Sequence, residues 1–284
     1  MTGFQRALAC AALIVTGMAA AAEPQRVEIP AGGRSSSPAP LVGYLFRPPG
    51  AGPHPAVVMM HGCGGAYAKS GKLNSRHQMW GDLLSERGYA ALMVDSFTSR
   101  GLREICTIKL SERVLKEADR VGDAHAALAF LRGLPEVAPN DIGLLGWSHG
   151  GGVALGAITQ KPSIDGFRAA VAFYPGCSTR ARRADTFHPY APTLVLIGRS
   201  DNWTPAAPCE ALVAAVAARG EPMSIVTYAG AYHDFDSPLL TGSRVRQDVP
   251  NGVNPGQGVT IAGNPEARED AIKRVSAFFA LHLH

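Results

Sequence analysis

Apolar and polar positions along the chain follow two alternating patterns. Short continuous apolar runs predict strands buried on both faces of a sheet, and they occupy residues 41–46, 56–60, 89–94, 142–145, 169–174, 193–197 and 224–228. Apolar residues at helical spacing and alanine-rich stretches predict helices at 75–87, 114–131, 149–158, 209–218 and 266–281. Strands that alternate with helices indicate an α/β fold with a mostly parallel central sheet and helices on both faces.

Two segments have no clear period. Residues 23–40 are rich in Pro, Gly and Ser, with one candidate strand at 27–29, and we interpret them as an edge segment or a loop. Residues 237–263 are rich in Gly, Pro, Asn and Val, and we expect a long surface loop near the C-terminal edge of the sheet. Because no linker or internal repeat interrupts residues 23–284, we predict that they form a single domain.

The beginning of the chain has the pattern of a secretory signal peptide. Arg6 precedes an apolar run at 8–15, and an alanine-rich stretch ends at Ala22, directly before Glu23. This order predicts a signal peptide over residues 1–22, cleaved between Ala22 and Glu23. The apolar run is too short to span a membrane comfortably. We therefore expect a periplasmic or secreted protein without a stable membrane anchor; a buried N-terminal helix is the alternative.

Composition limits the classes of partner. The formal net charge is +4, from 27 basic and 23 acidic residues, and no block of lysines or arginines accompanies it. Nucleic acid is therefore not a predicted partner.

The cysteines predict disulfide bonds in an exported protein. Removal of the leader leaves Cys63, Cys106, Cys177 and Cys209, an even number without any C-x-x-C pair. Cys63 and Cys106 both lie in loops that leave strand ends at one sheet edge. Cys177 follows one strand, and Cys209 opens the helix after the neighbouring strand. We expect the pairs Cys63–Cys106 and Cys177–Cys209; four buried thiols are the alternative.

One short motif suggests covalent chemistry. The predicted strand 142–145 runs into Gly146-Trp-Ser-His-Gly150, and a predicted helix follows. Glycines on both sides permit a strained bend that exposes the hydroxyl of Ser148. Two further residues, Asp201 and His233, follow later strands. Because the C-terminal ends of parallel strands lie at one edge of the sheet, we expect both residues to lie near Ser148.

These three residue types fit nucleophilic catalysis. A serine hydroxyl needs a base to take its proton, and a carboxylate holds that histidine in the required tautomer. We therefore assign Ser148 as nucleophile, His233 as base and Asp201 as orienting acid. Asp234 and Asp236, which flank the histidine in sequence, and Asp95, at another strand end, are alternative acids.

The negative charge that develops on the substrate needs backbone N–H donors. We expect one from His149 and the second from Cys63, with Gly62 as the alternative. Tyr67 and Trp203 are candidate pocket walls or ordinary surface aromatics. His61 is expected to hold its loop by hydrogen bonds, and His125 to be a core histidine.

With these motifs in place, the sequence resembles the α/β-hydrolase superfamily and, within it, the dienelactone hydrolase family. The resemblance runs from about Leu41 to the C-terminus. It rests on His61-Gly-Cys-Gly-Gly65, Asp95-Ser-Phe97, Gly146-Trp-Ser-His-Gly150, Tyr174-Pro-Gly176, Gly198-Arg-Ser-Asp201 and Tyr232-His-Asp-Phe-Asp236. It implies an α/β-hydrolase fold, the roles assigned above and a lidless or lightly covered site.

The sequence departs from that family at two places. Dienelactone hydrolases use a cysteine nucleophile and carry a glutamate after the strand that corresponds to 56–60, whereas this chain has Ser148 and His61-Gly-Cys-Gly-Gly65. A general carboxylic ester, or a lactone, therefore fits better than dienelactone. The leading hypothesis is an exported serine esterase that acts on a small-molecule substrate without a metal or organic cofactor. The alternatives are an exported peptidase of the same fold and a non-catalytic binding protein.

Overall fold

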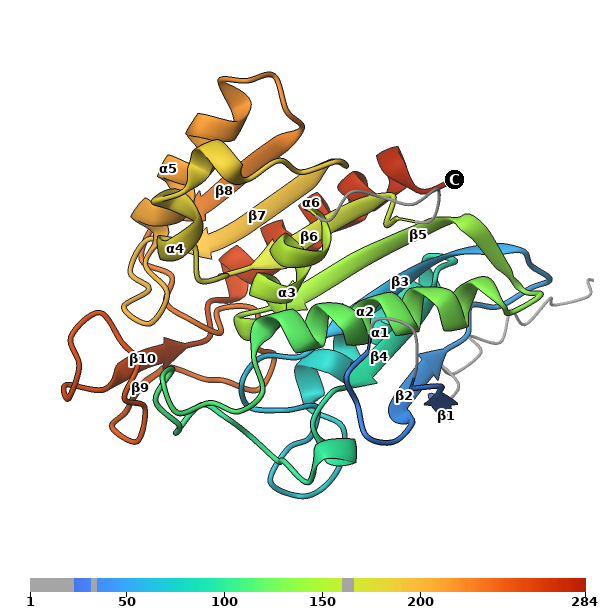
Figure 1. Ribbon diagram of the computed structural model, residues 1–284, viewed down its shortest axis with the longest axis horizontal. Coiled ribbons are helices and arrows are strands. Elements are labelled where there is room, and N and C mark those ends of the chain that lie inside the picture. The colour runs from blue at the N-terminus through green and yellow to red at the C-terminus, as the bar shows by residue number, and fades with distance from the viewer. Residues whose placement is uncertain (1–22, 32–34, 160–165) are drawn as a thin grey trace, which may run out of the picture.

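The central element of the protein is an eight-stranded sheet. The computed structural model describes residues 23–31, 35–159 and 166–284, so the predicted signal peptide lies outside the described residues. The strands are ordered β1-β2-β4-β3-β5-β6-β7-β8 across the sheet (Figure 1). Their bounds are β1 Gln25–Ile29, β2 Leu41–Phe46, β3 His54–Met60, β4 Ala90–Asp95, β5 Val137–Trp147, β6 Ala169–Phe173, β7 Thr193–Gly198 and β8 Met223–Tyr228.

Strands β3 to β8 are mutually parallel, whereas β2 is antiparallel to β4 and β1 to β2. All residues of β4, β6 and β7 are buried, which explains why these strands are continuous apolar runs rather than alternating ones. The register pairs Met60 with Gly146 and Trp147 with Phe173, so these neighbouring strands end at the same edge. The loops that follow them therefore converge at that edge.

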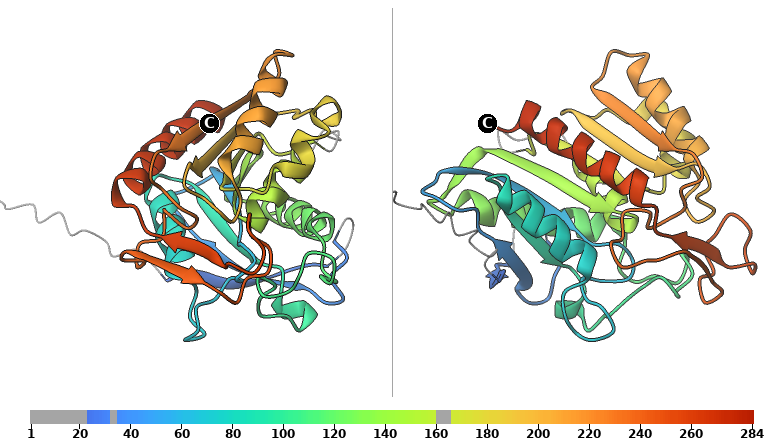
Figure 2. Two further views of the ribbon diagram at one scale, coloured as in Figure 1. Left: turned by 90° about the vertical axis from the view of Figure 1, so that its left-hand side faces the viewer. Right: turned by 180° about the vertical axis from the view of Figure 1, so that it is seen from behind.

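Helices cover both faces of the sheet. Helices α1 (Ser75–Glu86) and α6 (Pro265–His282) lie on one face, and α2 (Glu117–Arg132), α3 (His149–Ala157) and α5 (Ala206–Ala217) lie on the other (Figure 2). Short helices complete the chain at η1 (Thr98–Arg100), α4 (Ser178–Ala181) and η2 (Ala184–Thr186). This arrangement confirms the predicted α/β-hydrolase fold. No helix within the described ranges is long and apolar enough to cross a membrane.

The expectation of a long loop at 237–263 is wrong in part. This segment contains β9 (Ser243–Arg246) and β10 (Val259–Ala262), an antiparallel pair that lies beyond the C-terminal ends of the main sheet (Figure 1). Three of the four residues of β9 are exposed, so the strand has no apolar period that sequence analysis detects. Tertiary contacts hold the pair in place: the Ala262 N–H donates to the His233 carbonyl at 3.1 Å.

Candidate active site

Ser148 occupies the sharp turn between β5 and α3. Its φ of 54° and ψ of −115° are unusual for a residue with a side chain. Both flanking glycines are required by close approach of the backbone. A Cβ at Gly146 would lie 2.0 Å from the Gly150 carbonyl oxygen, and one at Gly150 would lie 2.0 Å from the Met60 carbonyl oxygen. The sequence motif thus forms the strained strand-to-helix bend that was expected.

Asp201 and His233 form a buried hydrogen-bonded pair. The His233 Nδ1 lies 2.7 Å from Asp201 Oδ2, and the two residues are 1% and 4% exposed, respectively. The N–H groups of Trp203 and Thr204 donate to Asp201 Oδ1 at 2.8 and 2.9 Å, so the carboxylate cannot rotate freely. Burial lowers the pKa of His233, but the charge and hydrogen bond of Asp201 outweigh it and the net shift is upward. With Nδ1 engaged, Nε2 is the ring nitrogen left for a substrate or nucleophile.

Ser148 and His233 line the same cavity, which has a volume of about 160 Å³. The His233 ring is held between two aromatic side chains, with ring-centroid distances of 4.5 Å to Tyr174 and 4.7 Å to Trp203. The structure therefore brings the three predicted residues, from the ends of β5, β7 and β8, to one place.

The three alternative acids make other contacts. Asp234 forms an ion pair with Arg76 at 2.6 Å. Asp236 accepts hydrogen bonds from two indole N–H groups and a phenol. Asp95 accepts from two backbone N–H groups at the start of η1. Of the four aspartates considered, Asp201 is the one that contacts Nδ1 of His233.

Asp236 organises a buried aromatic cluster that sequence reasoning missed. The residue is fully buried, and it accepts from Trp80 Nε1 at 3.0 Å, Trp147 Nε1 at 2.9 Å and the Tyr174 hydroxyl at 2.6 Å. These donors come from α1, the end of β5 and the residue after β6. Because Asp236 lies three residues after His233, the cluster anchors the loop that carries the histidine. A buried indole or phenol needs an acceptor, but the sequence does not say which carboxylate supplies it.

The predicted oxyanion donors lie beside Ser148. His149 is the first residue of α3, so its N–H has no acceptor within its own helix. Cys63 lines the cavity that holds Ser148 and His233, and Gly62, the alternative donor, lines it too.

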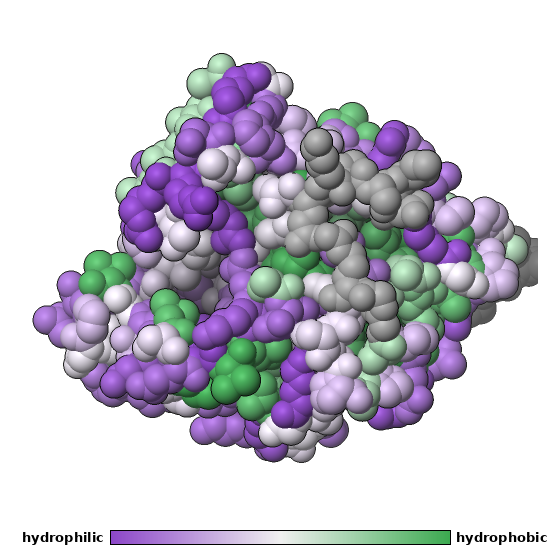
Figure 3. Space-filling model, in the orientation of Figure 1, coloured by the Kyte–Doolittle hydropathy of each residue, from purple (hydrophilic) through white to green (hydrophobic). Residues whose placement is uncertain are grey.

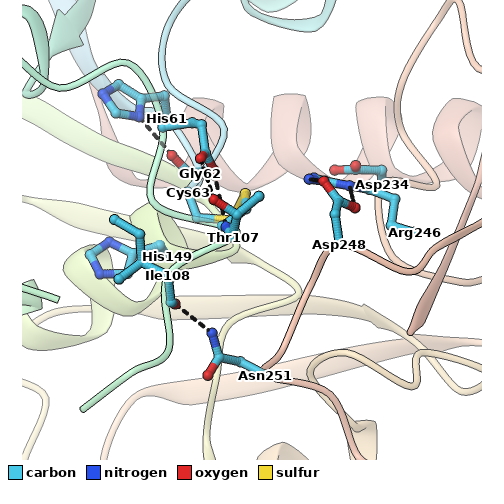
Figure 4. The surroundings of a disulfide bond; sticks show 12 residues. His61, Gly62, Cys63, Thr107, Ile108, His149, Asp234, Arg246, Asp248 and Asn251 are labelled. Carbon is cyan, nitrogen blue, oxygen red and sulfur yellow. Dashed lines mark hydrogen bonds and ion pairs between the residues drawn. A yellow bond between two sulfur atoms is a disulfide. The ribbon is translucent and has the colours of Figure 1, made fainter. Parts of the chain in front are cut away.

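His61 supports the loop that carries these donors. The Nδ1 atom of its ring lies 2.7 Å from the Gly62 carbonyl oxygen (Figure 4). The Nε2 atom accepts the Ser96 N–H at 3.2 Å. An acceptor at Nε2 places the proton on Nδ1, which then donates to Gly62. Burial, followed by the charge of Arg120, lowers the pKa of His61 far below its usual value, so the ring is neutral. The expected structural role of His61 agrees with these contacts.

Both expected disulfides are present. Cys63 is bonded to Cys106, and Cys177 is bonded to Cys209. The first bond ties the loop after β3 to the segment between η1 and α2 (Figure 4).

A second, larger cavity is also lined by Ser148. It has a volume of about 540 Å³, and Cys63, Ser148 and Trp203 line both cavities. The further lining residues include Leu110, Arg113, His149, Gly176, Arg180 and Asn251. Figure 3 shows the surface hollowed in this region, between α4 and the segment that carries β9 and β10.

Of the two aromatic residues proposed as pocket walls, the structure brings one to the site. Trp203 lines both cavities beside Ser148. Tyr67 lines a different cavity, with Asp95 and Phe97, so the expectation for Tyr67 is corrected. Its hydroxyl lies 3.2 Å from the hydroxyl of Tyr44, on β2.

Three arginines on the smaller cavity were not anticipated. Arg76 lies near the start of α1, and Arg244 and Arg246 belong to β9, within the segment predicted as a surface loop. Arg246 is paired with Asp248 at 2.7 Å and lies 5.6 Å from the centroid of the Trp203 ring. Residues so distant in sequence give no local signal that they share a cavity. Across the described part of the chain, no group of three or more His, Cys, Asp or Glu side chains is placed to hold a metal ion.

Comparison with known proteins points to one family. The sequence model of the dienelactone hydrolase family matches residues 41–283. A putative carboxymethylenebutenolidase of Synechocystis is 25% identical over 206 residues, which cover 69% of this chain and 81% of that protein. The quorum-quenching protein AidA of Acinetobacter baumannii is 30% identical over 146 residues, which cover 46% of this chain and 43% of AidA. The chain thus spans about half the length of AidA and of two Mycobacterium tuberculosis relatives.

Solved structures share the fold. A putative dienelactone hydrolase from Klebsiella pneumoniae superposes with a TM-score of 0.68 at 20% identity, covering 90% of this chain and 98% of that one. Esterase 2 of Thermogutta terrifontis, solved after phosphorylation by paraoxon, gives a TM-score of 0.64 at 17% identity, covering 91% and 94%. At these identities the likeness shows the fold alone.

Proposed function

The chain belongs to the dienelactone hydrolase family, and from that premise we propose that it is an exported serine hydrolase of carboxylic esters. The observation that carries the proposal is the arrangement of three residues. Asp201 holds His233 at 2.7 Å, and the histidine shares a cavity with Ser148 on its strained turn. This combination of nucleophile, base and orienting acid is what acyl transfer requires.

In the proposed reaction, Ser148 Oγ attacks the ester carbonyl carbon while His233 Nε2 takes its proton. The negative charge that forms on the carbonyl oxygen is stabilised by the N–H groups of His149 and Cys63. The imidazolium, stabilised by Asp201, then gives its proton to the leaving alcohol, and an acyl-enzyme on Ser148 remains. A water molecule, deprotonated by His233, then attacks the acyl-enzyme. The imidazolium returns its proton to Ser148 Oγ as the acyl bond to the serine breaks, and the acid is released.

The two cavities suggest where the halves of the substrate bind. Because His233 must protonate the leaving alcohol, that half belongs in the cavity that His233 lines. This cavity is small, and charged side chains line it: Arg244, Arg246 and the ion pair of Arg76 with Asp234. A short polar alcohol therefore fits it best. The acyl half then occupies the larger cavity, which Ser148 also lines.

Export is part of the proposal. The Arg6 start, apolar run and alanine-rich end of residues 1–22 support it. The two disulfides support it too, because disulfides persist in oxidising compartments. Intact-mass analysis of protein recovered from the periplasm or medium should give a chain that begins at Glu23. Recovery of a cytoplasmic chain that retains Met1 would contradict export.

Replacement of Ser148 by alanine tests the central assignment. We expect Ser148→Ala to abolish turnover of a short-chain p-nitrophenyl ester and labelling by a fluorophosphonate probe, with an unchanged circular dichroism spectrum. Ser276→Ala, on α6 far from the cavities, is the matched control and should keep both. If Ser148→Ala retains more than about a tenth of wild-type kcat/KM, equivalent to less than about 1.4 kcal/mol of transition-state stabilisation, the assignment fails.

A further inference from the structure

Arg120, on α2, is a fully buried cation without an acidic partner. Its exposed fraction is 0%, and no carboxylate of the described chain forms an ion pair with its guanidinium. Asp123, whose charge raises the pKa of Arg120, forms its ion pair with Arg100 at 2.9 Å instead. Burial lowers the pKa of Arg120 to about 10. An unpaired buried charge is unfavourable unless hydrogen-bond acceptors compensate it, so the acceptors of Arg120 are informative.

The two acceptors belong to the two segments that flank the nucleophile. Arg120 Nη2 donates to the His61 carbonyl oxygen at 2.7 Å, and Nη1 donates to His149 Nδ1 at 2.8 Å. Burial, and then the charge of Arg120, lowers the pKa of His149 far below its usual value, so the ring is neutral and its Nδ1 can accept. The guanidinium also lies 5.1 Å from the centroid of the Phe97 ring.

Each of these segments carries one expected oxyanion donor. His149 supplies its own N–H. On the other segment, the His61 ring contacts the Gly62 carbonyl at 2.7 Å, and this carbonyl belongs to the same peptide unit as the Cys63 N–H (Figure 4). A hydrogen bond to a peptide carbonyl fixes the plane of that peptide and polarises its N–H. Contacts from Arg120 therefore lead to both donors.

We propose that Arg120 is a positioning residue that sets the separation of the two oxyanion donors. The inference rests on the proposed function. An oxyanion hole works when both N–H groups lie 2.7–3.1 Å from one point, and here those groups come from separate segments of the chain. A planar, rigid guanidinium that binds both segments fixes their spacing better than a flexible ammonium. Arg120 lines neither cavity, so it acts through His61 and His149 rather than on the substrate.

The positive charge of Arg120 adds to this effect. Charge interactions are much stronger in a buried site than in water. A fixed cation behind the donors favours the transition state, in which the carbonyl oxygen is negative, over the neutral ground state. Removal of Arg120 should thus reduce kcat more than it raises KM.

The test compares Arg120→Met and Arg120→Lys with the matched control Arg100→Met. Arg100 is a second largely buried arginine that contacts α2, where it pairs with Asp123, and its own hydrogen bonds go to Ser96 and Asp123 rather than to His61 or His149. Three quantities are measured for each variant: kcat and KM on a short-chain p-nitrophenyl ester, the inhibition constant of a trifluoromethyl ketone, and the thermal midpoint. The ketone forms a tetrahedral adduct with Ser148 and reports directly on the oxyanion hole.

We expect Arg120→Met to lower kcat by about thirtyfold or more, with KM changed less than threefold. The loss of kcat should stay below the upper end of the 10²–10³-fold loss that follows removal of an oxyanion donor itself. Ketone binding should weaken by a similar factor. Arg120→Lys, which keeps the charge but reaches one acceptor, should fall between wild type and Arg120→Met. Arg100→Met should lower the thermal midpoint yet keep kcat within about threefold.

The outcomes separate this inference from the proposed function. If wild-type protein hydrolyses no ester and takes no fluorophosphonate label, the proposed function fails. If wild type is active and either Arg120 variant retains wild-type kcat, the inference is overturned. A loss of kcat without weaker ketone binding also overturns it. Should Arg120→Met fail to fold, Arg120→Lys gives the decision.

Discussion

The two disulfides provide a matched pair for separating stability from catalysis. Cys63–Cys106 joins residues 43 apart in sequence, and Cys177–Cys209 joins residues 32 apart. All four cysteines are buried, with exposed fractions of 5% or less. The difference between them is that Cys63 carries an expected oxyanion donor. We therefore compare the double variant Cys63→Ala with Cys106→Ala against Cys177→Ala with Cys209→Ala.

The loss of stability should be similar for the two pairs. Closing a loop of 43 or 32 residues restricts the unfolded chain, and the chain-entropy estimate is about 4 kcal/mol in each case. For a domain of this size, such a loss corresponds to a fall of roughly 10 °C in the thermal midpoint. The slow growth of loop entropy with length explains why 11 extra residues matter little.

The loss of activity should differ. Without its bond to Cys106, the loop after β3 loses a tether next to the expected oxyanion hole, and a small displacement of Cys63 weakens the hydrogen bond to the transition state. We expect kcat to fall about tenfold further in the Cys63/Cys106 pair than in the Cys177/Cys209 pair.

The assay is urea unfolding without reductant, together with kcat on a short-chain p-nitrophenyl ester at a temperature where both variants are folded. Equal kcat values in the two double variants would refute the link between the Cys63–Cys106 bond and the oxyanion hole. An unfolding free energy equal to that of wild type in either variant would show that the bond in question contributes no stability.

Three further predictions follow from the site and its supports. The acid limb of the pH profile of kcat/KM should have its midpoint above pH 6.5, because Asp201 raises the pKa of His233 against the effect of burial. Asp201→Asn should move this limb to lower pH, and an unmoved limb would contradict the assignment of Asp201. Gly150→Ala should destabilise the protein by about 3 kcal/mol in urea unfolding, because the new Cβ would lie 2.0 Å from a carbonyl oxygen. The control Gly64→Ala, whose Cβ meets nothing within 4 Å, should leave the unfolding free energy nearly unchanged. Burial, and then the charge of a neighbouring arginine, lowers the pKa of His77 to about 3, so its contribution to stability is present above pH 6.5 and is lost as the pH falls. Between pH 7 and 4.5 the loss should be about 2–3 kcal/mol, and it should shrink in His77→Gln when unfolding is measured at both pH values.

Local sequence was sufficient for the elements of the sheet and for the nucleophile turn. Strands buried on both faces must be apolar at every position, so β4, β6 and β7 are visible without any knowledge of their neighbours. The turn at Ser148 is visible for a different reason. Backbone atoms a few residues away and in the adjacent strand β3 leave no room for a Cβ at either glycine. The need for glycine therefore appears in the sequence as a five-residue motif.

Residues at strand ends were also accessible, because topology constrains them. In a parallel sheet the C-terminal ends of all strands face one edge, so Ser148, Asp201 and His233 could be expected to converge once their strands were assigned. Which carboxylate holds the histidine was a different question. Sequence favoured Asp201, which follows a strand, over Asp234 and Asp236, which flank the histidine. The structure shows where the two alternatives are engaged: Asp234 pairs with Arg76, and Asp236 accepts from aromatic donors.

The sequence by itself determined the α/β fold, the strained turn and the residue types for acyl transfer, because each depends on local patterning or on strand order. The tertiary structure alone decided the walls of the site. Pairing of β9 with β10 depends on contacts with the His233 loop, and it brings Arg244 to the small cavity. Tyr67 turns away toward Tyr44, and Arg120 reaches His61 and His149 from a separate helix. Such contacts join residues far apart in the chain, and the local sequence around a side chain does not indicate which distant residue it contacts.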